Sequence, residues 1–235
     1  MNEKLTFIEI NPGMGSFGFA AEAAGLLRLG PMMLSTDVRD TYVAFHGYGS
    51  DTPLADAADL VVADLPFSMF LDGKNADPEI IDVIKLAKAA ARKNGAIVFR
   101  VKWDIGQRLL MPQEEYLAVV RTAFPKHLVA WFVDSNLGSD SLPTTDLYIV
   151  VSSEVIDLTD FNVPDEGVTA IHPVPLDDPA LDKIDPQLIL DALGFPEDFS
   201  ALAANLPNVH ERLRECVAIR RAKLVLEFVA SHIRG

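Results

Sequence analysis

The sequence predicts a doubly wound α/β fold, with a mostly parallel sheet and helices on both faces. In the first 155 residues, short apolar runs alternate with segments of helical periodicity. Residues 60–63 form a continuous apolar run, which is typical of a strand that a parallel sheet buries on both faces. The last two expected strands are joined by a turn-rich segment without a helix, which predicts a closing hairpin with one antiparallel strand.

The expected elements follow from these patterns in chain order. Strands are expected at residues 5–10, 32–36, 60–63, 96–101, 128–133 and 147–151, and helices at 17–29, 41–46, 78–93 and 113–123. The helix at 78–93 gathers cations towards its C-terminus, where the helix dipole favours them, and Asn94-Gly95 is expected to stop it. Two more helices are expected at 186–193 and at about 208–232.

These elements divide the chain into three expected parts. Residues 1–155 form the α/β core, and residues 156–185, which are rich in proline and aspartate, form a surface linker. Residues 186–235 form helices that pack back on the core near the first strand.

Composition limits the classes of function. A chain of 235 residues with 49% hydrophobic side chains can bury one good core. It has no apolar run of about 20 residues and no signal-peptide pattern, so we expect no membrane association. The single cysteine, Cys216, excludes an internal disulfide, fits a cytoplasmic protein, and is interpreted as a buried small hydrophobe. The five histidines lack metal-ligand spacing, and no metal site is expected.

The net charge of −14 also bears on function. Lysine and arginine neutralise phosphates in duplex DNA complexes, and here 20 of them stand against 34 acidic residues. Direct duplex DNA binding by this chain alone is therefore not expected. Two interpretations stay open: a general solubilising surface, or an acidic face for a basic protein partner. The basic residues between 212 and 223 are interpreted as a solvated helix face.

A glycine-containing turn follows the first strand, in the segment Asn11-Pro-Gly-Met-Gly-Ser16. Gly13 and Gly15 allow a backbone to pass close to a ligand, and the following helix presents free N–H groups to an anion. A tight strand-to-helix connection with no ligand is the alternative.

The opening of the chain and the Asp64-Leu-Pro-Phe67 loop together resemble the cytosine carbon-5 DNA methyltransferase family. In that family, a Phe-Ala-Gly-x-Gly-Gly turn holds S-adenosylmethionine, and a Pro-Cys-Gln loop carries the nucleophile. The most specific match is Leu193-Gly-Phe-Pro-Glu-Asp-Phe199, which is similar to a segment near the family's C-terminus.

The resemblance implies a candidate cofactor site. Gly13 and Gly15 would hold the methionine carboxylate, Asp37 the ribose hydroxyls and Asp51 the adenine amine. Asp37 could equally be a helix N-cap, and Asp51 part of a polar loop. Asn11 stands where the family has an adenine-stacking phenylalanine, so we expect S-adenosylmethionine binding to be weak or absent.

The family's catalytic elements are replaced. Phe67 stands at the cysteine position and cannot attack carbon 6 of cytosine. Phe99 is assigned to the position of the glutamate that protonates the ring, and the segment 139–149 lacks the family's arginines. The linker stands where the family inserts its target-recognition domain.

Two functional hypotheses remain. The first is a methyltransferase-like pseudoenzyme related to DNA modification, a binding or regulatory module that acts through protein contacts. The second is an active S-adenosylmethionine-dependent enzyme that methylates a nucleobase amine or a small molecule, with Asp64, Pro66 and Phe67 as its catalytic candidates. A compact copy without a reader domain suits a phage or mobile element.

Overall fold

The computed structural model describes residues 4–32, 55–65, 78–102, 113–135, 145–157, 161, 179–214 and 216–233. No helix within these ranges is long and apolar enough to cross a membrane.

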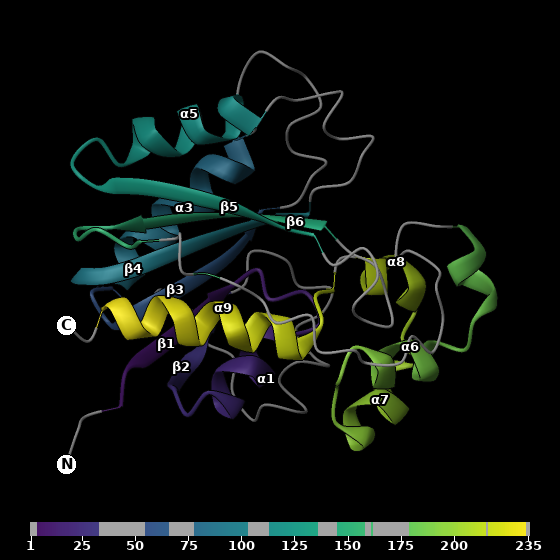
Figure 1. The fold of residues 1–235 in the computed structure, drawn as a ribbon. Coiled ribbons are helices and arrows are strands. Elements are labelled where there is room, and N and C mark those ends of the chain that lie inside the picture. Colours follow the sequence, from purple (N-terminus) through teal and green to yellow (C-terminus); the bar gives the residue numbers. More distant parts are fainter. Residues whose placement is uncertain are drawn as a thin grey trace.

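The described strands form one twisted sheet at the centre of the molecule (Figure 1). Their bounds are β1 Thr6–Ile10, β2 Leu27–Met32, β3 Ala58–Leu65, β4 Ala91–Lys102, β5 Leu128–Ser135 and β6 Thr145–Ser152. The strand order is β2-β1-β3-β4-β6-β5. The pairs β1–β2, β1–β3 and β3–β4 are parallel, whereas β6 is antiparallel to both β4 and β5. The predicted fold class and the closing hairpin are therefore confirmed.

Helices cover both faces of the sheet (Figure 1). Their bounds are α1 Ser16–Ala23, α3 Pro78–Ala90, α5 Gln113–Ala123, α6 Pro186–Ala192, α7 Glu197–Ala203, α8 Val209–Arg214 and α9 Ile219–His232, with a short 3₁₀ helix at Pro179–Lys183. One core lies between the sheet and α3 and α5. The other lies between the sheet and α1 and α9, and it also includes α6, α7 and α8.

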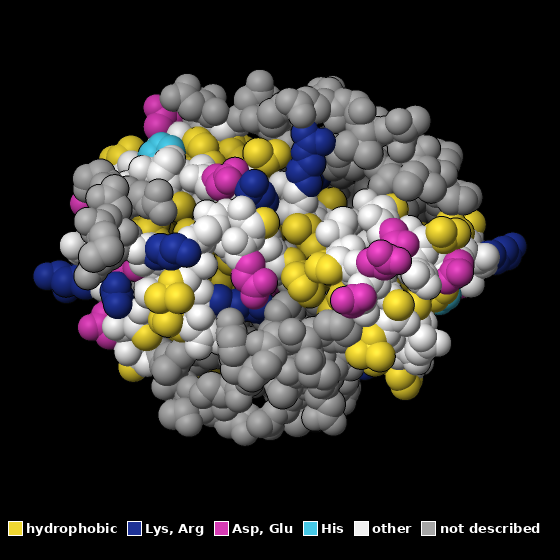
Figure 2. Space-filling view, turned by 90° about the horizontal axis from the view of Figure 1, so that it is seen from below, with side chains coloured by type: hydrophobic (Ala, Val, Ile, Leu, Met, Phe, Trp, Pro, Cys, Tyr) yellow, Lys and Arg dark blue, Asp and Glu magenta, His cyan; other side chains and the backbone are white. Residues whose placement is uncertain are grey.

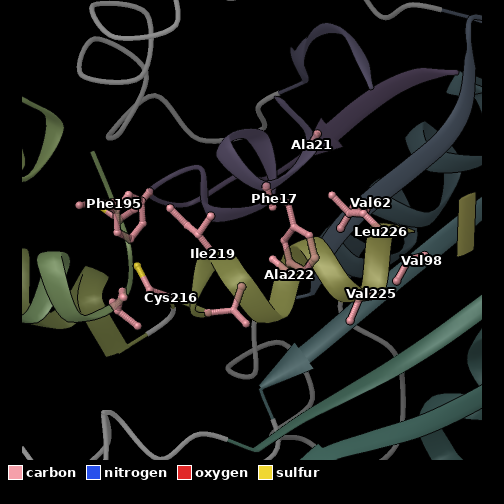
Figure 3. Close-up of a cluster of buried hydrophobic side chains, with 14 of the residues drawn as sticks. Phe17, Ala21, Val62, Val98, Phe195, Cys216, Ile219, Ala222, Val225 and Leu226 are labelled. Carbon is pink, nitrogen blue, oxygen red and sulfur yellow. The ribbon is translucent and has the colours of Figure 1, made fainter. Parts of the chain in front are cut away.

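The C-terminal helix α9 fills the centre of the second core (Figure 3). Its apolar side chains Ala222, Val225 and Leu226 lie between α1 and the sheet, where Val62 and Val98 meet them. Burial of this kind contributes about 1.5–3 kcal/mol for each large apolar side chain, so α9 is an integral part of the core.

Two predicted helices are longer than the observed ones. The helix expected at 17–29 ends at Ala23, because Gly25 takes a positive φ of 73° and turns the chain into β2. The second strand therefore runs over Leu27–Met32 instead of 32–36, and residues 33–36 lie outside the described ranges. The helix expected at 78–93 ends at Ala90, and β4 begins at once.

The prediction of one long helix at 208–232 is wrong. The segment forms two helices, α8 and α9, because residues 216–218 leave the helical conformation. Helix α7 was not predicted, and Arg221 is buried on α9 instead of lying on a solvated face. The helix expected at 41–46 and most of the linker lie outside the described residues.

Candidate functional site

The glycine turn lies at the carboxyl end of β1 and leads directly into α1. Asn11, Gly13 and Gly15 take positive φ values of 53°, 51° and 84°. The amide of Gly15 donates to the carbonyl of Pro12 at 2.7 Å, which closes the turn. Apart from Gly13 itself and its two chain neighbours, no atom of a described residue lies within 4 Å of the place where a Cβ would stand at Gly13. The turn thus has the open backbone that the sequence predicts for close approach of a ligand.

A protein carboxyl group lies at the N-terminus of α1. Glu9, on β1, accepts hydrogen bonds from the backbone N–H groups of Phe17 and Gly18. These belong to the first turn of the helix, where N–H groups lack partners within the helix. The anion position expected at this turn is therefore shared with Glu9, which sequence reasoning did not single out.

Glu9 is enclosed by charge as well as by the helix. Oε2 of Glu9 lies 3.4 Å from Nη2 of Arg28, and both side chains are almost completely buried. A Cβ on Gly18 would lie 2.0 Å from Nη2 of Arg28, so the guanidinium needs a glycine there. Burial, with a smaller contribution from the nearby carboxylate of Asp64, raises the pKa of Glu9 to about 8 against the lowering effect of Arg28.

Asp64, the candidate on β3, is held by an arginine from the neighbouring strand. Nη1 of Arg100, on β4, donates to Oδ2 of Asp64 at 3.2 Å. Nε and Nη2 of the same guanidinium lie 2.9 and 2.8 Å from Oδ1 of Asp146, on β6. The Arg100 and Asp146 side chains are only 3% and 1% exposed, and Asp64 is 23% exposed. A buried arginine thus bridges two carboxylates at the strand ends.

The five charged residues form one row across one face of the sheet. They come from β2, β1, β3, β4 and β6 in the order Arg28, Glu9, Asp64, Arg100 and Asp146, and we call them the charge row. In each of the last four strands, the apolar residue two positions away belongs to the core beneath α1 and α9. Because strand side chains alternate between faces, the charge row faces these helices.

The structure brings together some of the predicted site residues. The turn at Asn11, Gly13 and Gly15 and the end of β3 at Asp64 are neighbours, because Ile10 pairs with Ala63 in the sheet. Four predicted residues lie outside the described ranges: Asp37, Asp51, Pro66 and Phe67.

The assignment of Phe99 to the position of the family's glutamate requires a correction. Its ring is fully buried in the opposite core, against Phe124 of the α5 side, so it points away from Asp64. The residue that β4 directs at Asp64 is Arg100.

Sequence reasoning missed Glu9, Arg28, Arg100 and Asp146. Two of them carried a readable signal, because Glu9 and Arg100 are charged residues within runs of buried strand residues. A charge in such a run requires a partner, which the chain supplies from an adjacent strand. The partners themselves could not be read from the sequence, since they lie 19 to 46 positions away.

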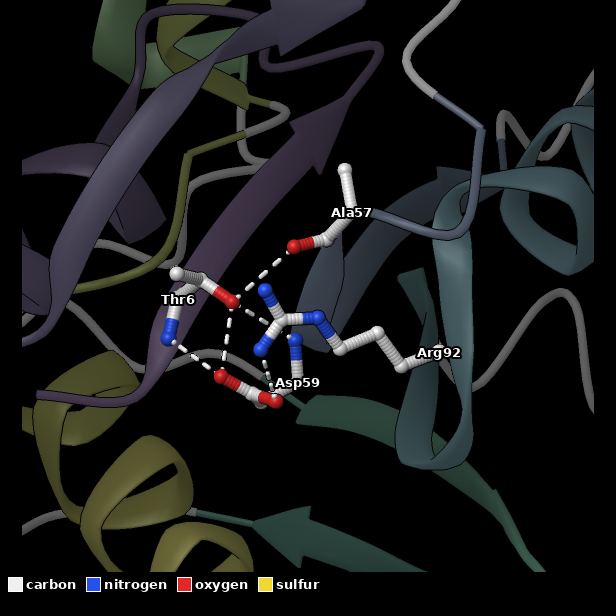
Figure 4. Close-up of polar contacts among 4 residues, drawn as sticks. All are labelled: Thr6, Ala57, Asp59 and Arg92. Carbon is white, nitrogen blue, oxygen red and sulfur yellow. Dashed lines mark hydrogen bonds and ion pairs between the residues drawn. The ribbon is translucent and has the colours of Figure 1, made fainter. Parts of the chain in front are cut away.

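A second polar cluster lies at the opposite end of the strands, where β1, β3 and β4 begin (Figure 4). Oδ2 of Asp59 accepts from the backbone amide and from the hydroxyl of Thr6, each at 2.7 Å, and Oδ1 accepts from Arg92 at 2.8 Å. An open hollow of about 390 Å³ lies beside it. Of the predicted site residues that the structure describes, none lines this hollow. The cluster is interpreted as a clamp that joins the starts of β1, β3 and β4.

Within the described parts of the chain, no three side chains form a metal-binding group. The combination of a parallel sheet, an antiparallel β6 and a glycine turn after β1 is that of an S-adenosylmethionine-dependent methyltransferase α/β fold.

Comparison with solved structures confirms the fold and the resemblance at the level of fold. The chain is similar to the Dnmt2 methyltransferase of S. pombe, with a TM-score of 0.62 and 11% identity over 98% of each chain. It is also similar to the Entamoeba histolytica methyltransferase EhMeth, with a TM-score of 0.62 and 10% identity over 100% of each chain. It is similar as well to a DNMT2 mutant of Spodoptera frugiperda, with a TM-score of 0.60 and 10% identity over 97% of this chain and 100% of the other. No protein-family model and no curated protein sequence matches the chain.

Proposed function

We propose that this protein is a methyltransferase-fold binding or regulatory module, related to DNA modification, that does not methylate carbon 5 of cytosine. The observation that carries the proposal is the bridge that Arg100 makes between Asp64 and Asp146 at the strand ends.

The charges of this bridge are opposite in sign to those that the resembled family uses on the corresponding strands. In that family, a glutamate at the end of this strand protonates the cytosine ring, and arginines precede the last strand. Here β4 carries Arg100 and β6 carries Asp146. A guanidinium stays protonated at physiological pH, so Arg100 is not available as a general acid. Together with Phe67 at the nucleophile position, this leaves neither covalent attack nor ring protonation provided for.

The surface supports a protein partner over duplex DNA. The short C-terminal helices carry exposed acidic side chains at Asp191, Glu197 and Asp198, and acidic groups cluster at that end of the molecule in Figure 2. Phosphates would be repelled by such a face and by the net charge of −14, whereas a basic protein would be attracted.

A second candidate function is a methyltransferase of different chemistry, and the open glycine turn favours it. The turn keeps its positive φ values and its space at Gly13, so S-adenosylmethionine could bind there, with Asp64, Pro66 and Phe67 near a substrate amine. Against it, Asp64 already accepts a hydrogen bond from Arg100.

Calorimetric titration with S-adenosylmethionine separates the two candidates. We expect weak binding at most, since Asn11 offers no aromatic face for adenine and a stacked contact is worth about 1 kcal/mol. The variant Gly13→Val should abolish any binding, because a β-branched residue is strained at a φ of 51° and its side chain fills the open space.

Gly25→Ala serves as the matched control, since Gly25 also has a positive φ but lies after α1, away from the turn. Tight binding by the natural protein, accompanied by methyl transfer to an amine, would favour the second candidate over the first. Unchanged affinity in Gly13→Val would place the ligand elsewhere.

A further inference from the structure

The charge row touches the C-terminal part of the chain at the junction between α8 and α9. Nη2 of Arg100 donates to the carbonyl oxygen of Cys216 at 3.4 Å. Cys216 is buried and lies between α8 and α9, where residues 216–218 are not helical. A charged group of the sheet is thus hydrogen-bonded to the backbone of the α8–α9 junction.

The junction is held from a second side by the backbone. The amide of Ile219 donates to the carbonyl of Leu193 at the end of α6, at 2.9 Å. From this point α9 runs beside α1 in the core on the same face of the sheet, and α1 carries the glycine turn at its start (Figure 3). The position of the junction therefore sets where α9 enters the core beside the candidate site.

We propose that Arg100 is a positioning residue that fastens the α8–α9 junction to the strand ends, so that the charge row and the C-terminal helices behave as one unit. Asp64 and Asp146 orient the guanidinium, and the remaining donor capacity of Nη2 is directed at Cys216. The fork of an arginine makes these contacts from one side chain, which a lysine cannot do. The proposal does not depend on whether the chain binds a cofactor.

The junction carries its own reporter. Cys216 is the single cysteine of the sequence and is 3% exposed, so the rate at which a thiol reagent labels the native protein measures opening of this junction. In Arg100→Met we expect labelling to rise about tenfold, since a hydrogen bond from a charged donor is lost. Cys216 should also be labelled faster in Arg100→Lys. A lysine keeps the positive charge next to Asp146, but it lacks the forked donors that reach the carbonyl oxygen of Cys216 at the same time.

Removal of Arg100 also leaves Asp146 buried without its partner, which weakens the whole fold. The double variant Arg100→Met/Asp146→Leu separates the two effects. Replacing a buried ion pair with apolar side chains is often neutral for stability. We therefore expect this variant to unfold in urea near the natural midpoint while its Cys216 still labels about ten times faster.

The matched control is Arg92→Met, at the other end of the same strand. Arg92 also pairs with an aspartate, but at the edge of the sheet remote from the junction, and it should leave the labelling rate within twofold. The proposal would be overturned if Cys216 were labelled in Arg100→Met at the same rate as in the natural protein. The same rate in a double variant that is as stable as the natural protein would also overturn it. Equal acceleration in Arg92→Met would also overturn it.

Discussion

At the scale of single residues, the surroundings of two acidic side chains shift their pKa values in opposite directions. Burial raises the pKa of Glu9 to about 8, and Arg28 does not compensate for it. Burial also raises the pKa of Asp59, but three hydrogen bonds, two from Thr6 and one from Arg92, outweigh it and lower the pKa below its usual range (Figure 4). Glu9 lies in the candidate site and Asp59 in the clamp at the far edge.

Glu9→Gln tests the raised pKa. Between pH 4.5, the ordinary value, and about pH 8, the folded protein holds a proton that the unfolded chain releases, so stability falls as pH rises through this window. Glutamine cannot titrate. The free energy of unfolding of the natural protein minus that of Glu9→Gln, from urea titrations, should therefore decrease from pH 5 to pH 8 and level off above it. A difference that stays constant with pH would contradict the raised pKa.

Asp59→Asn should give a pH dependence of the opposite sign. The carboxylate stabilises the fold above its unfolded pKa, and this stabilisation is lost as pH falls through the lower folded pKa. We expect the variant to lose about 1–3 kcal/mol at pH 7, with the loss shrinking in acid. Asp82→Asn is the control, because its exposed pair with Lys85 contributes little. Equal losses in both variants would show that the clamp is an ordinary surface pair.

At the scale of secondary-structure elements, β4 begins in an irregular way that depends on one glycine. Ala58 pairs with Ala91, but Leu60 pairs with Ala96, so β4 carries extra residues opposite β3. A Cβ on Gly95 would lie 2.8 Å from the carbonyl oxygen of Asp59 and 3.0 Å from that of Ala58. Backbone atoms cannot move aside as a flexible side chain can.

Gly95→Ala should therefore destabilise the protein, by about 1–3 kcal/mol. The urea midpoint of the variant measures this loss. Lys93→Ala, at an exposed position of the same segment, should change the midpoint little. If both variants unfold at the natural midpoint, β3 and β4 are not in close contact at Gly95.

Local sequence patterns predicted the elements whose structure is decided locally. The buried strand at 60–63 and the helix at 113–123 follow from apolar periodicity, and both are observed. The break between α8 and α9 could not be predicted, because the helical pattern runs on. At the break, the backbone makes hydrogen bonds to residues that are distant in the sequence. The carbonyl of Cys216 accepts from Arg100, and the amide of Ile219 donates to Leu193. The glycine turn was predicted, whereas the partners of its neighbouring charges come from other strands.

At the scale of the whole molecule, the chain combines a methyltransferase fold with a different arrangement of charges at its strand ends. The fold is that of Dnmt2-like structures at 10–11% identity, so the scaffold is kept while most side chains differ. The resemblance of the sequence to the cytosine carbon-5 methyltransferases implies that the family's cysteine, glutamate and arginines are replaced together in this chain. For this reason Phe67→Cys alone should not restore activity, since Arg100 still stands next to Asp64.

The most direct test of this account is transfer of a labelled methyl group from S-adenosylmethionine to duplex DNA, followed by digestion and separation of the nucleosides. We expect no 5-methylcytosine above the protein-free background, either from the natural protein or from Phe67→Cys. Labelled 5-methylcytosine formed by the natural protein would contradict the central claim.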